Sequence, residues 1–200
     1  MYLILACLVM AIGFTVERMM YLRKASISKN EFIETMQKCI TAGDVAQAIK
    51  VCSAEDAPLS RIVKSGLLKV NRPDDEVQAA MDEAALRELP LIERRTPYLG
   101  LLANVGMLCG LFGTVVGLIK AFGEVASADA ASKATGLAHG IEEAMNCTAF
   151  GLITAVFALV MMGLLNGKTQ KLIDDINLAT VQVLNLVVGN RSRVDLQNLG

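Results

Sequence analysis

The sequence predicts an all-α membrane protein with three transmembrane helices and long helical cytoplasmic extensions. Of its 200 residues, 54% are hydrophobic and only 20% are charged, whereas roughly a quarter of the residues of a soluble domain are charged. Two segments, Thr96–Ile119 and Ala144–Gly167, contain no charged residue, and each exceeds the about 20 apolar residues that cross a bilayer. A third apolar run, Met1–Val16, is shorter and reaches that length if Arg18 extends its charge to the interface.

Charges beside these segments predict their orientation, because basic residues mark the cytoplasmic ends of membrane spans. Basic residues follow the first span (Arg18, Arg23 and Lys24), precede the second (Arg94 and Arg95) and follow the third (Lys168 and Lys171). The stretch between the second and third spans, Lys120–Glu143, holds two basic and four acidic residues. Since the basic residues follow the first apolar run rather than precede it, an uncleaved anchor is favoured over a signal peptide.

We therefore expect the N-terminus and one short hairpin outside and the remaining polar segments in the cytoplasm. The predicted segments are transmembrane helix 1 at 1–22, a cytoplasmic helical region at 23–95, transmembrane helix 2 at 96–122, an external hairpin at 123–139, transmembrane helix 3 at 140–167 and a cytoplasmic C-terminal helix at 168–200.

Helical signals run through the cytoplasmic region. Ser28 and Glu31 have the spacing of a capping box. Apolar residues at helical spacing predict further helices at Asp44–Ser53, Leu59–Val70 and Glu76–Leu89, the last two separated by Asn71-Arg72-Pro73. Pro90 and Pro97 are expected to kink the entry to the second span. After Thr169 the apolar residues keep a helical period, which predicts that the third span continues as a helix into the cytoplasm.

Small residues form one continuous face on each of the second and third spans. The faces comprise Gly106, Gly110, Thr114, Gly117 and Ala121 on one span and Ala144, Thr148, Gly151, Ala155 and Ala158 on the other. Small residues let membrane helices approach closely, so one interpretation is a packing groove whose threonine hydroxyls bond to the preceding turn. The other is a partly polar wall that encloses another helix.

Two polar residues lie where the third span begins. Glu143 is explained either as an acid at a helix N-terminus, where it complements the helix dipole, or as a functional carboxylate at the edge of the membrane. Asn146 adds a second polar group within the apolar run.

Several function classes are excluded or disfavoured. A net charge of −1 and 4% aromatic residues argue against a nucleic-acid surface. The five cysteines are scattered, and His139 is the single histidine, so we expect no metal site. No combination of Ser, His, Asp or Cys has the arrangement of a catalytic site, so we expect no enzyme and no cofactor other than a transported H⁺ or Na⁺.

The segment Thr96–Phe122, with Gly-Leu-Phe-Gly-Thr-Val at 110–115, resembles the second span of the MotA/TolQ/ExbB family. Gly140–Leu152 is similar to the start of that family's third span, and the Glu17-Arg18…Leu22-Arg23 exit from the first span also fits. Met107 and Phe157 stand where relatives often have proline.

This resemblance implies a multi-pass subunit of a bacterial inner-membrane motor. Such subunits form a homo-oligomeric ring, a pentamer in some relatives, around a single-span partner of the ExbD/TolR/MotB type whose transmembrane aspartate takes and releases the ion. By resemblance, Thr114, Thr148 and Glu143, with Asn146 beside them, line the ion pathway. Gly106, Gly110, Gly117, Ala144, Gly151 and Ala155 remain the predicted packing face.

The sequence leaves alternatives open. A non-conducting membrane scaffold, oligomerised through its glycine-rich faces, explains the same small residues. The process that would be powered is open among import, envelope integrity, gliding and flagellar rotation, and so is the choice between H⁺ and Na⁺.

Overall fold

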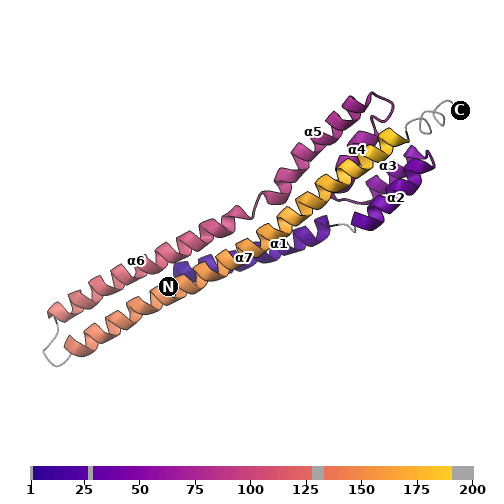
Figure 1. Ribbon diagram of the computed structural model, residues 1–200. Coiled ribbons are helices and arrows are strands. Elements are labelled where there is room, and N and C mark those ends of the chain that lie inside the picture. Colours follow the sequence, from indigo (N-terminus) through magenta and orange to yellow (C-terminus); the bar gives the residue numbers. More distant parts are fainter. Residues whose placement is uncertain (1, 27–28, 128–132, 191–200) are drawn as a thin grey trace. The chain divides into compact units, whose positions relative to one another are not determined.

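A computed structural model describes residues 2–26, 29–127 and 133–190 (Figure 1). These residues form helices joined by short turns, and none of them lies in a strand. The chain divides into two compact units. The first, called here the apolar unit, comprises Met1–Met19 and Arg95–Asn166. The second, the amphipathic unit, comprises Met20–Arg94 and Gly167–Gly200.

The apolar unit contains most of α1 (Tyr2–Ala25), all of α6 (Pro97–Ser127) and the first part of α7 (Lys133–Gly189). These three elements supply the apolar helical runs that are long enough to cross a membrane. Many of their large apolar side chains are exposed, among them Leu5, Phe112 and Val160. Such an apolar surface is unusual in a soluble protein, so the predicted three-helix membrane architecture is confirmed at the level of helix length and composition.

Two contacts join α1 to the start of α6. The rings of Phe14 and Tyr98 stack with centroids 6.2 Å apart, and Arg95 forms an ion pair with Glu17. Pro97 is the first residue of α6, a position where its missing N–H leaves no intrahelical hydrogen bond unmade.

The helices extend beyond the predicted segment limits. α1 continues to Ala25, α6 to Ser127, and α7 begins at Lys133, so helical structure occupies much of the 123–139 segment expected to be a hairpin. Helix hydrogen bonds form in water as well as in lipid, and residues such as Lys120 and Glu124 favour helices. Helix ends therefore need not coincide with the limits of an apolar segment.

The amphipathic unit is built from short helices that pack in chain order. They are α2 (Lys29–Thr41), α3 (Val45–Ala54), α4 (Pro58–Leu67) and α5 (Asp74–Glu93), and each contacts the next. Their core is made of large side chains with almost no exposed surface, namely Met36, Ile40, Ile62, Val63, Leu67, Val77 and Met81. From α7, Ile176, Ala179, Val183 and Val187 are buried at helical spacing, in agreement with the predicted continuation of the third span as a helix.

Local signals set the helix boundaries in this unit. Gly43 has a positive φ of 81°, which glycine adopts at low cost, and it ends the turn after α2. The Asp44 side chain then caps α3 by accepting a hydrogen bond from the Gln47 N–H at 2.8 Å. The breaker at Asn71-Arg72-Pro73 precedes α5 as expected. Pro90 lies inside α5, and the capping residue proposed at Ser28 lies outside the described residues.

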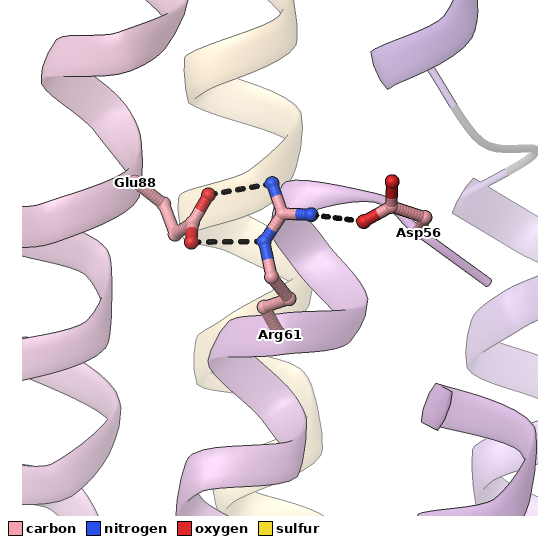
Figure 2. A network of polar contacts seen from close by, with 3 residues as sticks. All are labelled: Asp56, Arg61 and Glu88. Carbon is pink, nitrogen blue, oxygen red and sulfur yellow. Dashed lines mark hydrogen bonds and ion pairs between the residues drawn. The ribbon is translucent and has the colours of Figure 1, made fainter. Parts of the chain in front are cut away.

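An ion-pair network links α4 and α5 (Figure 2). Arg61 donates two hydrogen bonds to the carboxylate of Glu88, at 2.8 and 2.7 Å, and a third to Asp56 at 2.5 Å. Glu88 is only 16% exposed. Its hydrogen bonds raise the pKa of the Arg61 guanidinium, with smaller contributions in the same direction from the charges of Glu88 and Asp56.

Candidate functional site

α6 and α7 run antiparallel and touch along their small residues (Figure 1). Backbone lies directly against backbone at Gly110 and Gly151. A Cβ atom added to Gly110 would lie 3.0 Å from the Gly151 Cα, and one added to Gly151 would lie 2.9 Å from the Gly110 Cα. Real Cβ atoms rarely come so near to backbone, so these two glycines allow a spacing that alanine would prevent.

The other predicted packing residues lie along the same contact. A Cβ on Gly106 would lie 3.1 Å from the Thr154 Cγ2, and a Cβ on Gly117 would lie 3.0 Å from the Ala144 Cβ. Ala144 and Ala155 are almost fully buried. The structure therefore brings the glycine face of α6 against the small face of α7 within one chain.

The two threonines differ in their hydrogen bonding. The Thr114 hydroxyl donates to the Leu111 carbonyl oxygen at 2.6 Å, the bond to the preceding turn that a packing role requires. The Thr148 Oγ1 is buried and has no hydrogen-bond partner among the described residues. A buried hydroxyl without a partner costs about 1–3 kcal/mol, so a group that bonds it would recover stability.

Neighbouring contacts set the two threonines at similar levels along the helix pair. Thr114 lies between Gly113, which faces Cys147, and Gly117, which faces Ala144. Thr148 follows Cys147 directly and precedes Gly151. Thr148 therefore belongs to the α6–α7 contact, and Thr114 lies at the same level along α6.

A cavity of about 230 Å³ lies beside this contact, within the apolar unit. Its wall is mainly apolar and combines residues of α1, α6 and α7: Leu3, Ile4, Cys109, Phe112, Gly113, Val116, Gly117, Lys120, Glu143 and Cys147. Glu143 and Lys120 are the charged residues in that lining, so a carboxylate and an ammonium share a small, largely apolar space.

The structure does not bring all four predicted pathway residues to the cavity. Glu143 lines the cavity, Thr148 belongs to the adjoining helix contact, and Thr114 lies at a similar level on α6. Asn146 is exposed and is not among the residues that line the cavity.

Of the ten lining residues, the sequence prediction included Glu143 and Gly117 and missed the other eight, among them Lys120 and Cys147. Signals for both were present, since Lys120 is the first charge after the uncharged segment of α6 and Cys147 lies one helical turn beyond Glu143.

The profile of the MotA/TolQ/ExbB proton channel family matches residues 54–177. This stretch contains all of α6 and both sides of the glycine contact. The chain is 36% identical over 96 residues to the Tol-Pal system protein TolQ of Haemophilus influenzae, covering 48% of this chain and 42% of that protein. It is 31% identical over 129 residues to TolQ of Pseudomonas aeruginosa, covering 59% of this chain and 55% of the relative.

A longer alignment relates the chain to an ExbB-like protein 3 of Synechocystis. The two are 26% identical over 152 residues, which cover 76% of this chain and 72% of the relative. The chain thus spans about half the length of the TolQ proteins that it matches and more of the ExbB-like one. With the family profile matched over more than half of its length, this chain belongs to the MotA/TolQ/ExbB proton channel family.

Proposed function

We propose that this chain is an ion-conducting subunit of an inner-membrane motor that converts the ion motive force into mechanical work on envelope components. Membership of a proton channel family supports the ion-conducting part. The similarity to Tol-Pal system TolQ proteins and to an ExbB-like protein supports the assignment to an energising complex. The ion is H⁺ or Na⁺.

The proposed assembly is a ring of this chain, five copies by analogy with relatives, around a single-span partner of the ExbD/TolR/MotB type. In this arrangement the N-terminus and the 123–139 segment face the periplasm, and residues 23–95 and 168–200 lie in the cytoplasm. The apolar surfaces of α1, α6 and α7 supply the lipid-facing and subunit-facing area that such a ring needs.

The observation that supports this function best is the unpartnered hydroxyl of Thr148. The residue lies on the tightly packed small face, where a buried polar atom without a bond is costly. A threonine hydroxyl both donates and accepts hydrogen bonds. It can therefore bond a carboxylate in its charged or its protonated form, which is what a partner's ion-carrying aspartate requires.

The energy source is adequate for such a step. Each elementary charge that crosses the membrane potential releases about 2.3 kcal/mol per 100 mV. This exceeds the thermal energy severalfold, so one ion per step can bias the rotation or displacement of an enclosed helix. Glu143 supplies a carboxylate within this chain, and the aspartate that binds and releases the ion comes from the partner.

Substitution of Thr148 tests the proposal. Thr148→Val keeps the shape of the side chain and removes the hydroxyl, whereas Thr148→Ser keeps the hydroxyl. Proton uptake is to be measured in vesicles that contain the chain and its partner, with assembly checked by size-exclusion chromatography. We expect Thr148→Val to assemble normally with at least about tenfold lower flux, as one hydrogen bond to a charged group is worth about 1.5–3 kcal/mol, and Thr148→Ser to retain most of the flux.

The alternative is a non-conducting scaffold held together by the glycine faces, which the Gly110–Gly151 contact also supports. A scaffold would tolerate Thr148→Val, and its cellular role would not depend on the membrane gradient. Unchanged flux in Thr148→Val and in Thr114→Ala would therefore refute the motor function and leave the scaffold.

A further inference from the structure

The cavity of the apolar unit pairs two opposite charges in an otherwise apolar lining. Glu143 on α7 and Lys120 on α6 both contribute to its wall. Each is also the charge that bounds an uncharged helical segment, since residues 96–119 and 144–167 contain none. The two residues therefore lie at the same end of the helix pair.

The helix register brings them to a common level. Gly117 faces Ala144, and a Cβ on Gly140 would lie only 2.2 Å from the Ala121 Cβ. Lys120 and Glu143 lie between these two contacts, within about one helical turn of 5.4 Å along the axis. Both residues are exposed in the single chain, so at this separation their opposite charges attract each other with the modest strength of a solvent-screened pair.

We propose that Lys120 is a specificity-determining residue, whose ammonium group acts as the fixed counter-ion of Glu143 and keeps alkali-metal cations away from this carboxylate. The proposal rests on the proposed ion-conducting function and names the ion class that the Glu143 cavity rejects.

The chemistry of the lining explains the discrimination. A hard cation such as Na⁺ binds several oxygen atoms at once. Among the described residues of the lining, Glu143 is the one with side-chain oxygens, and the Lys120 ammonium is a donor without any acceptor. A proton needs no coordination shell, because it forms a covalent O–H bond with one carboxylate oxygen. The remaining ionisable groups of the lining, the Cys109 and Cys147 thiols, are neutral when protonated, and α1 contributes only Leu3 and Ile4.

Carbodiimide labelling tests the proposal on the full chain in native membranes. Dicyclohexylcarbodiimide reacts with protonated carboxyl groups, so a cation bound to the carboxylate protects it. Glu143 labelling is to be quantified by peptide mass spectrometry at fixed pH, with NaCl exchanged for choline chloride at constant ionic strength. The variants are Lys120→Met, which keeps the chain length and adds no oxygen, and Lys120→Arg, which keeps the charge. Lys133→Gln removes an exposed lysine of α7 that does not line the cavity, as a matched control.

We expect Na⁺ to protect Glu143 in Lys120→Met at a concentration about two- to fivefold lower than in the wild type, the size of a screened interaction between exposed charges. Lys120→Arg and Lys133→Gln should behave as the wild type. Equal Na⁺ dependence in the wild type and Lys120→Met would overturn the proposal, as would a Glu143 that resists the reagent in both. Labelling needs neither the partner nor ion flux, so this result is independent of the Thr148 test.

Discussion

Replacing Gly151 with alanine should separate α6 from α7. The added Cβ would lie 2.9 Å from the Gly110 Cα and 3.0 Å from the Gly106 carbonyl oxygen, whereas carbon atoms in favourable contact are about 3.5–4.0 Å apart. Both neighbours are backbone atoms, so no side-chain rotation relieves the overlap. The helices must move apart by roughly 0.5–1 Å, which weakens the other contacts along the small faces.

The expected cost follows from two opposing terms. Overpacking of a well-packed contact costs about 1–3 kcal/mol, and replacing glycine by alanine within a helix returns about 0.5–1 kcal/mol. The net loss for Gly151→Ala is therefore about 1 kcal/mol, within a range of about 0–2.5 kcal/mol. Gly163 provides a matched control on the same helix, because a Cβ there would meet no atom within 4 Å. Gly163→Ala should gain the stability that alanine gives a helix without any overpacking, so this variant should be as stable as the wild type or slightly more stable.

Unfolding by sodium dodecyl sulfate in mixed micelles, followed by circular dichroism, measures this difference. We expect the unfolding midpoint of Gly151→Ala to fall clearly below that of the wild type and that of Gly163→Ala to equal or exceed it. Equal midpoints for the two variants would refute the close backbone contact, and with it the register from which the levels of Thr114, Thr148 and Lys120 are derived.

Two further predictions concern the amphipathic unit. Glu88→Gln should destabilise it by about 1–3 kcal/mol, because Glu88 is mostly buried and accepts two hydrogen bonds from Arg61. The control Glu83→Gln breaks the exposed ion pair with Arg87 and should cost less than about 1 kcal/mol. Equal thermal midpoints for the two variants would contradict the ion-pair network of Arg61. Burial is the main cause that raises the pKa of the Cys52 thiol to about 11 from an ordinary value of 9.0, so the folded state favours the neutral thiol. The thiol's contribution to the free energy of unfolding is therefore complete below pH 9 and is lost as the pH rises to 11. Relative to Cys52→Ala, the wild type should lose on the order of 2–3 kcal/mol across this window in denaturant titrations, and parallel pH profiles would show that the thiol is not buried.

Much of the fold was predictable because it depends on local properties of the chain. The uncharged segments of α6 and α7 set their helical, apolar character whatever they contact, and Asp44 and Pro73 mark helix starts through their own backbone and side-chain chemistry. The small-residue spacing also indicated which face of each helix would allow close approach, although not which helix would occupy it.

The site was less predictable because it depends on register. Lys120 and Glu143 are 23 positions apart in the sequence, and nothing local indicates that α6 and α7 align them in one cavity. Arg61 and Glu88, 27 positions apart, are paired by the packing of α4 on α5 in the same way. The contrast between Thr114, which bonds back to Leu111, and Thr148, which does not, depends on side-chain rotation that the sequence does not specify.

A density map of the proposed complex between this chain and a single-span partner would test the motor function most directly. We expect the hydroxyls of Thr114 and Thr148 to point toward the central axis, within hydrogen-bonding reach of a carboxylate on the enclosed helix. Both hydroxyls pointing into lipid would contradict the motor function and leave an anchored oligomer.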